Sequence, residues 1–220
     1  MKIAEIFYSI QGEGTLAGVP SVFIRTSGCN LRCRWCDTPY TSWSPEGGEM
    51  TIAAILAQAR SYGSSHYVVT GGEPMIAPGI VELTRALEGH LTIETAGTVY
   101  KDVRCDLMSI SPKLAHSTPQ GSWAERHERL RYQPEVLRRL IGEYEYQLKF
   151  VVAAPADLEE IRAILGEIEA DRARVLLMAE GTDAAAIRER AKWITEIAKR
   201  EGFRYSPRLH IDLWGNERGV

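Results

Sequence analysis

Residues 27–38 read SGCNLRCRWCDT and hold three of the four cysteines of the chain, Cys29, Cys33 and Cys36. This C-x3-C-x2-C spacing places three thiols on one short loop. Thiolates that lie so close together bind a metal ion or an iron–sulfur cluster, or they become oxidised. The fourth cysteine, Cys105, stands alone and is predicted to be a small buried apolar side chain.

The number of cysteines favours an iron–sulfur cluster over zinc. A structural zinc site needs four ligands, usually as two pairs of Cys or His, and the next histidine after the loop is His66. Three thiolates suit a 4Fe–4S cluster whose fourth iron is open to another ligand. Trp35, just before the last cysteine, would shield such a cluster from water. A zinc knuckle with a distant fourth ligand, or three unrelated thiols, remain the alternatives.

A second motif follows the strand predicted at 66–70. It reads Gly71-Gly72-Glu73-Pro74. Glycines at the carboxyl end of a parallel strand let a small molecule approach the backbone, and Glu73 can accept a hydrogen bond from a cation; a plain turn is the alternative. The two motifs in this order resemble those of the radical S-adenosylmethionine (SAM) superfamily, in which SAM chelates the open iron and the second motif contacts its ammonium group.

Composition excludes several classes of protein. The chain has 220 residues, 45% hydrophobic residues and a net charge of −3, which suits a single domain over 1–220 and no nucleic-acid surface. A locally basic run at 126–139 is interrupted by glutamates and is predicted to be a solvated loop and helix face. The N-terminus lacks the apolar core of a signal peptide, and no apolar run could span a bilayer. We therefore expect no membrane partner, a cytoplasmic location and reduced cysteines.

The order of predicted elements indicates an α/β fold. Parallel βα units are predicted from β-branched runs that mostly alternate with helices, and they are too few to close an eight-stranded barrel. The expected fold is an open, partial βα barrel of about six parallel strands. The strands are predicted near 22–26, 66–70, 91–95, 106–110, 146–152 and 174–178, after a first strand at 3–8, with helices near 51–61, 79–88, 135–141, 157–168 and 183–200. Residues 114–133 are expected to form a long polar surface segment.

Three further features point to a ligand site. The turn Gln11-Gly12-Glu13-Gly14 could bring backbone polar groups to a ligand or be an ordinary surface turn. Arg25 lies in an apolar strand, so its guanidinium needs either an anionic ligand or a structural salt bridge. The glycine-rich tail 209–220 contains Trp214 and is expected to pack near the site. His210 is a site candidate; His66, His90, His116 and His127 are expected to be structural or surface groups.

Four pieces of the sequence beyond the superfamily motifs resemble the 7-carboxy-7-deazaguanine synthase family. They are residues 7–14 (FYSIQGEG), 36–38 (CDT), 94–98 (ETAGT) and 209–220 (LHIDLWGNERGV). The resemblance implies a radical SAM lyase of queuosine and 7-deazapurine biosynthesis, which converts 6-carboxy-5,6,7,8-tetrahydropterin to 7-carboxy-7-deazaguanine and ammonia. It also implies a 4Fe–4S cluster, SAM used as a recycled cofactor, Mg²⁺, an electron donor such as flavodoxin or ferredoxin, and a homodimer.

The resemblance also implies roles for individual residues. No residue is expected to act as a catalytic acid or base, because the cofactors carry the chemistry. The cofactor-binding residues are expected to be Cys29, Cys33 and Cys36 on the cluster, with Asp37, Gly72, Glu73, Ser111, Lys113, Met178 and Gly181. The substrate-binding residues are expected to be Ile10, Gln11, Gly12, Glu13, Arg25, Thr70, His210 and Val220, the last by its terminal carboxylate. Thr38 is the expected Mg²⁺ ligand; a hydroxyl that orders the loop is its alternative role.

Two other functions compete with this one. A glycyl-radical-enzyme activase would share the cysteine loop and Gly71–Pro74 but would act on a protein. A zinc-binding interaction module would not be an enzyme and would contain zinc without iron or sulfide. The turn at 11–14 and the tail at 214–220 favour the synthase.

Overall fold

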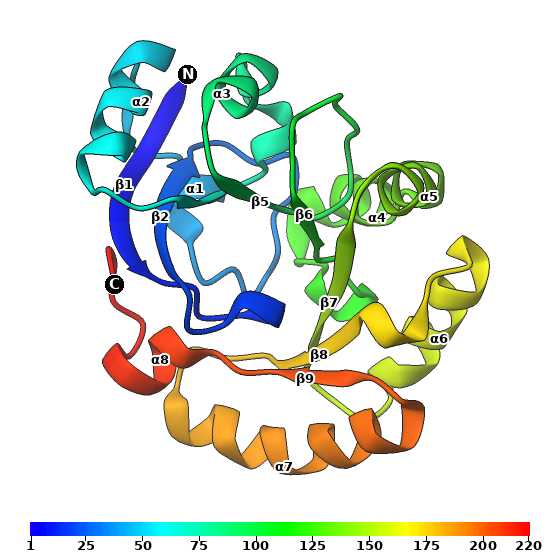
Figure 1. Ribbon diagram of the computed structural model, residues 1–220. Coiled ribbons are helices and arrows are strands. Elements are labelled where there is room, and N and C mark those ends of the chain that lie inside the picture. The colour runs from blue at the N-terminus through cyan, green and yellow to red at the C-terminus, as the bar shows by residue number, and fades with distance from the viewer.

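The computed structural model describes residues 1–220 as one strongly curved sheet of nine strands, with helices packed on its outer face (Figure 1). The strands lie in the order β3-β1-β2-β4-β5-β6-β7-β8-β9. Their bounds are β1 (Lys2–Ile10), β2 (Pro20–Thr26), β3 (Gly48–Glu49), β4 (His66–Gly71), β5 (His90–Thr95), β6 (Leu107–Ile110), β7 (Tyr146–Val152), β8 (Val175–Ala179) and β9 (Arg204–Ser206). The helices are α1 (Pro39–Ser42), α2 (Ile52–Ser61), α3 (Ile80–Ala86), α4 (Ala124–Arg131), α5 (Pro134–Glu143), α6 (Asp157–Ile168), α7 (Ala184–Glu201) and α8 (Leu209–Trp214).

The sheet is an open partial barrel, as predicted. Every neighbouring pair from β2 to β9 is parallel, whereas β1 is antiparallel to β2 and β3 is antiparallel to β1. The two ends of the sheet, β3 and β9, do not pair, so the barrel stays open. All six predicted parallel strands are present, within two residues of their expected bounds. The sequence prediction missed a seventh, β9, which has three residues.

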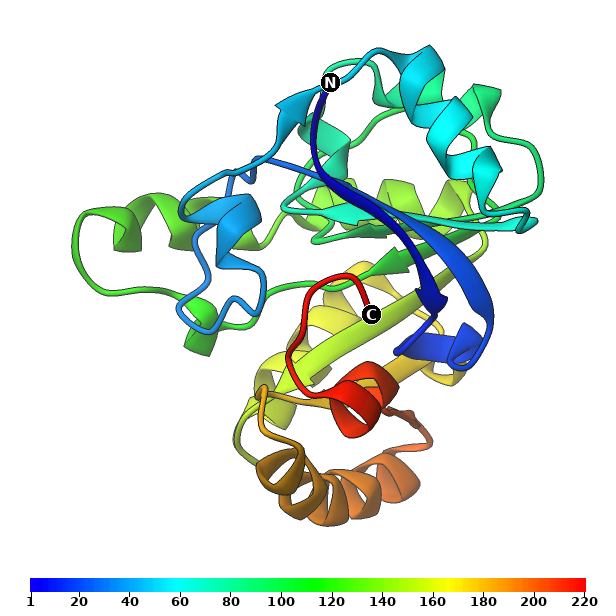
Figure 2. The same cartoon turned by 90° about the vertical axis from the view of Figure 1, so that its left-hand side faces the viewer.

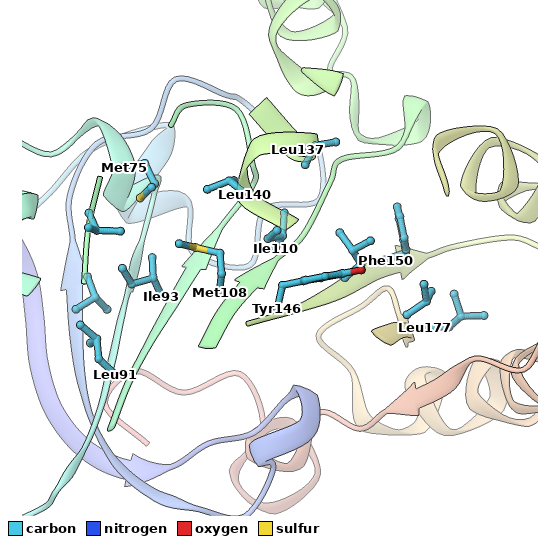
Figure 3. Packing of buried hydrophobic residues seen from close by; sticks show 14 of the residues in the cluster. Met75, Leu91, Ile93, Met108, Ile110, Leu137, Leu140, Tyr146, Phe150 and Leu177 are labelled. Carbon is cyan, nitrogen blue, oxygen red and sulfur yellow. The ribbon is translucent and has the colours of Figure 1, made fainter. Parts of the chain in front are cut away.

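The two faces of the sheet differ in chemistry, because successive side chains along a strand point to opposite faces. In β7, Tyr146, Leu148 and Phe150 belong to the main core of 38 buried residues between sheet and helices (Figure 3). The alternate residues, Gln147 and Lys149, are buried as well but point to the inner face. Buried polar side chains need partners. The inner face is therefore built for polar contacts.

The long helices begin and end where the sequence predicts. The Thr51 hydroxyl accepts a hydrogen bond from the Ala54 amide (3.2 Å) at the start of α2. Asp183 caps α7 in the same way, and α7 ends at Gly202, whose φ of +72° suits glycine. None of the helices combines the length and apolar character needed to cross a bilayer.

Residues 114–133 contain helix α4, which the prediction of a polar surface segment missed. Its residues are mostly charged, and His127 is its one fully buried side chain. The residues of α4 therefore have no apolar stripe at helical spacing, and their pattern does not predict a helix. The helix is held instead by hydrogen bonds, including one from His127 Nε2 to the Ser117 hydroxyl (2.9 Å), and by an Arg131–Glu160 ion pair (2.7 Å).

Candidate active site

A cavity of about 440 Å³ lies on the inner face of the sheet. Its wall includes the cysteine loop, the carboxyl ends of the parallel strands and the C-terminal tail, which Figure 2 shows curling back from α8 toward β1. The sequence-predicted residues on this wall are Ile10, Gln11, Gly12, Glu13, Arg25, Cys29, Cys33, Cys36, Asp37, Thr38, Thr70, Gly72, Ser111, Lys113, Met178, His210 and Val220. Glu73 and Gly181 lie outside the wall.

The two motifs predicted from the sequence pack directly against each other. The Glu73 amide donates to the Gly28 carbonyl (2.9 Å), and the Gly28 amide donates to the Thr41 carbonyl (2.8 Å). A side chain at Gly72 would overlap the Gly28 carbonyl, so close packing of the two loops by itself requires a glycine there. The contact holds the cysteine loop at the carboxyl end of β4.

The three cysteines fit an iron–sulfur cluster. All are free, and all line the cavity. Burial raises the pKa of Cys29 to about 12 and that of Cys33 to about 11, so these thiols stay protonated until a metal displaces the proton. No three His, Cys, Asp or Glu side chains are placed to hold one metal ion. A cluster makes no such demand, because each thiolate binds a different iron.

Glu73 serves the fold rather than the cavity wall. Its carboxylate is fully buried and accepts hydrogen bonds from the Met75 amide (3.0 Å), the Thr95 hydroxyl (2.8 Å) and the Ala96 amide (2.8 Å). Burial raises the pKa of Glu73. This carboxylate ties the turn after β4 to the end of β5, and three protein donors occupy three of its about four acceptor positions.

The sequence prediction missed two buried cations in the site, Lys149 and Arg208. Lys149 on β7 donates to one oxygen of Glu13, and Arg208 donates to the other (3.0 Å). Arg208 also donates to Asp37 and to the Gly181 carbonyl. Both cations are 5% exposed. The signal that could have found Lys149 is a lysine that alternates with apolar residues in a strand.

This network keeps the two acidic groups charged. Burial acts to raise the pKa of Glu13, but the charges of Lys149 and Arg208 outweigh it and hold the pKa well below its usual range. Asp37 follows the same pattern: burial opposes ionisation, and Arg208 lowers its pKa overall. This network therefore contains two carboxylates and two cations in a fixed arrangement.

Glu94 presents a carboxylate at the end of β5, where the sequence pattern predicts a polar group at the cavity. It accepts hydrogen bonds from Gln11 Nε2 (3.2 Å) and the Thr70 hydroxyl (2.8 Å), and Lys149 Nζ lies 4.0 Å away. An ionised carboxylate has about four acceptor positions. Glu94 can therefore accept further hydrogen bonds from a ligand with N–H groups.

Arg25 and Thr38 have roles in the fold as well as places on the wall. Arg25 forms the structural salt bridge that the sequence left open, with Glu5 on β1 (2.7 Å). Thr38 precedes α1 but makes no capping bond; its hydroxyl lies 3.4 Å from that of Thr41 and 3.8 Å from Cys36 Sγ. Because the Thr38 hydroxyl does not cap the helix and faces the cavity, its oxygen can act as a ligand for a hard cation.

His210 and the tail close the other side. A side chain at Gly12 would overlap the His210 ring, so the 11–14 turn fits against α8 only with glycine. Burial lowers the pKa of His210, which favours a neutral ring 4.0 Å from Glu13. Arg218 fixes the tail: its guanidinium lies 3.7 Å from the Tyr40 ring centroid and 3.0 Å from Glu46. Val220, two residues further on, lies on the cavity wall.

Comparison with known proteins agrees with this geometry. The model of the radical SAM superfamily matches residues 23–146, which contain the cysteine loop and strands β4 to β6. The 7-carboxy-7-deazaguanine synthase of Halobacterium salinarum is 45% identical over 98% of this chain and 91% of its own length. That of Rhodopirellula baltica is 45% identical over 100% of this chain and 89% of its own.

A solved structure supports the same relationship. The crystal structure of QueE from Escherichia coli superposes with a TM-score of 0.68 at 27% identity, covering 93% of this chain and 92% of that one. The relatives match over nearly the whole length of the chain, including the turn at 11–14 and the tail that build the cavity. The chain therefore belongs to the radical SAM superfamily and, within it, to the 7-carboxy-7-deazaguanine synthase family.

Proposed function

We propose that this protein is a radical SAM lyase that converts 6-carboxy-5,6,7,8-tetrahydropterin to 7-carboxy-7-deazaguanine with release of ammonia. The observation that carries the proposal is the cavity itself: a three-cysteine loop and a polar inner face share one wall. Relatives that carry the synthase name match nearly the whole chain, so the activase alternative is not favoured.

The cysteines would hold the 4Fe–4S cluster, with Gly72, Ser111, Lys113 and Met178 beside the bound SAM. When bound, these cofactors supply the radical chemistry that no side chain of the protein can provide. Trp35 lines the cavity and donates to His116 (3.0 Å), which keeps the indole fixed beside the loop. Because Glu73 and Gly181 lie off the wall, we assign them to holding the turns around the cofactor.

The polar inner face would orient the pterin. A pterin carries ring N–H and amino groups that can donate hydrogen bonds to the Glu94 carboxylate. Gln11 and Thr70 donate to the same carboxylate and hold it in place. The Ile10–Glu13 turn and His210 would bound the ring on one side. Arg25 and Lys149 are the cations available to the substrate carboxylate, and the Val220 carboxylate would cover the remaining side. Fixed polar groups in a closed site position the reacting atom and exclude water.

We also propose Mg²⁺ at Thr38, with substrate oxygens and waters completing its shell, since Mg²⁺ is often held by few protein ligands. Four free cysteines suit a reducing, cytoplasmic location. A homodimer, and flavodoxin or ferredoxin as electron donor, complete the proposal; light scattering of the purified protein tests the dimer.

An anaerobic assay tests the function. The protein is reconstituted with iron and sulfide, reduced with dithionite, and given SAM, Mg²⁺ and 6-carboxytetrahydropterin, with product detected by mass spectrometry. We expect 7-carboxy-7-deazaguanine from the wild type and none from Cys33→Ser. A weaker Mg²⁺ dependence in Thr38→Ala supports the metal site. One zinc per chain without iron or sulfide would overturn the proposal.

A further inference from the structure

Five arginines make no ion pair with a carboxylate, although the other fifteen do. The five are Arg32, Arg34, Arg126, Arg129 and Arg204. Arg204 lies on β9. The other four, which we call the loop arginines, lie on the cysteine loop and on helix α4. Four of the five unpaired arginines thus lie at one place in a chain whose net charge is −3.

The two segments that carry the loop arginines pack together, although they are far apart in sequence. The Arg32 amide donates to His127 Nδ1 of α4 (3.1 Å), and the Arg34 amide donates to the Ser117 carbonyl (2.9 Å). The guanidinium groups of Arg32 and Arg126 lie 4.3 and 4.8 Å from the centroid of the Trp123 ring. Figure 2 shows both segments, blue and green, on the same side of the molecule.

The charge of this surface is not neutralised nearby. Arg34, Arg126 and Arg129 are exposed, and Arg32 is half-buried, donating to the carbonyls of Cys29 (2.8 Å) and Leu31 (2.7 Å). Of the two acidic residues on α4, Glu128 is already paired with Arg131 (2.5 Å). Glu125 is exposed and makes no ion pair, so the surface keeps a net positive charge.

The position of these charges gives them a use. Arg32 and Arg34 alternate with the three cysteines in sequence, so a partner seated on them lies directly outside the loop whose inner side lines the cavity. A protein that delivers electrons to this loop needs close approach, and complementary charge speeds such an encounter. Weak electron-transfer complexes use small, charged interfaces of this kind.

We propose that the loop arginines are the docking surface for an acidic, one-electron carrier protein. This inference rests on the proposed function, which requires one electron at the cysteine-bound cluster for each activation. In the complex the reduced carrier loses one electron and the cluster gains it, with no atom transferred. The carrier's acidic rim would face Arg34, Arg126 and Arg129, while Arg32 keeps the loop rigid through its carbonyl contacts.

Charge reversal on α4 tests the proposal without touching the cysteine loop. The variant carries Arg126→Glu and Arg129→Glu, and Arg204→Glu is the matched control, since Arg204 is also exposed and unpaired but lies on β9. Reduced flavodoxin, an acidic carrier, is the probe. Its Kd for each protein is measured by biolayer interferometry at low ionic strength and at roughly 0.5 M salt, where exposed charges are screened.

We expect the double variant to bind flavodoxin about tenfold or more weakly at low salt, and Arg204→Glu to match the wild type. The difference should shrink at high salt. Flavodoxin-driven turnover should fall with affinity, whereas dithionite-driven turnover, which needs no docking, should stay at the wild-type rate and show that the variant is folded. Failure of dithionite-driven turnover in the wild type would instead count against the proposed function.

Two results would overturn the docking proposal. One is an unchanged Kd and unchanged salt dependence in the double variant. The other is equal weakening in Arg204→Glu, which would mean that overall charge and not this surface attracts the carrier. Binding of a tRNA probe that the double variant abolishes, with flavodoxin binding intact, would assign the surface to a nucleic acid and likewise contradict the proposal.

Discussion

The guanidinium of Arg208 donates a hydrogen bond to the carboxylate of Asp37, a residue 171 positions earlier that directly follows the last cysteine of the loop. The same side chain donates to Glu13 (3.0 Å). One buried arginine thus joins the cysteine loop, the 11–14 turn and the start of α8, which all border the cavity.

Arg208→Gln should destabilise the protein and loosen the site. Removal of one partner from a buried ionic network costs about 3–5 kcal/mol, because the remaining charges stay buried. We expect a loss of that size in the free energy of unfolding measured with urea, together with a raised KM for the pterin. Arg188→Gln is the control: its ion pair with Asp212 is exposed, and it should change stability by less than about 0.5 kcal/mol. Equal losses in both variants would contradict the network's importance.

Glu94→Gln should weaken recognition of the pterin more than it weakens the fold. The substitution keeps the shape of the side chain but removes the charge that strengthens its accepted hydrogen bonds. A hydrogen bond to a charged group contributes about 1.5–3 kcal/mol, which corresponds to roughly a 10- to 100-fold loss in kcat/KM. SAM binding, measured by calorimetry, should not change. Unchanged kcat/KM would show that the substrate does not use this carboxylate.

Arg218→Ala should free the C-terminal tail. The arginine contacts the Tyr40 ring and Glu46, and its guanidinium also lies 3.9 Å from Glu5 on β1. We expect faster digestion by carboxypeptidase, a higher KM for the pterin and little change in the free energy of unfolding, since the guanidinium itself is exposed to solvent. Glu217→Gln, a neighbour with no ion pair, should digest at the wild-type rate. A tail equally protected in Arg218→Ala would refute this role.

Stability should fall as the pH drops from about 6.5 to 4 because of His127. Burial lowers the pKa of His127 from 6.5 to about 4, so the folded protein holds it neutral where the unfolded chain already binds a proton. The contribution of the neutral His127 to the free energy of unfolding is complete above pH 6.5 and is lost as the pH falls toward 4. The free energy of unfolding then changes by at most about 1.4 kcal/mol per pH unit. Urea titrations at several pH values measure this slope, and His127→Gln should flatten it. An unchanged slope in the variant would exclude His127 as its source.

The sequence predicts the parts of this fold that rest on local patterns. The apolar strands, the caps at Thr51 and Gly202 and the cysteine motif all act within a few residues, and the structure contains each of them. The sequence did not predict β9, because its three residues, Arg204 to Ser206, are too few to show an alternating hydrophobic pattern. It did not predict helix α4, because hydrogen bonds and not an apolar stripe hold this helix in place.

The location of the site could be predicted from the sequence, but the pairing of its charged residues could not. Residues at the carboxyl ends of parallel strands meet by topology, so most expected residues do line the cavity. The pairing of Glu13 with Lys149 and Arg208 joins residues more than a hundred positions apart, and no local pattern encodes it. For Glu73 the local pattern predicted a ligand contact. In the structure its carboxylate accepts hydrogen bonds from Met75, Thr95 and Ala96, which the pattern does not reveal.

The most direct test of the proposed function is the ratio of 7-carboxy-7-deazaguanine to 5′-deoxyadenosine formed in one anaerobic, dithionite-reduced reaction with SAM, Mg²⁺ and 6-carboxytetrahydropterin. We expect many molecules of 7-carboxy-7-deazaguanine for each 5′-deoxyadenosine, because the proposed reaction regenerates SAM in each turnover. If 5′-deoxyadenosine accumulates while the pterin is unchanged, the cysteine loop still carries a working cluster, but the polar inner face is not a site for this substrate.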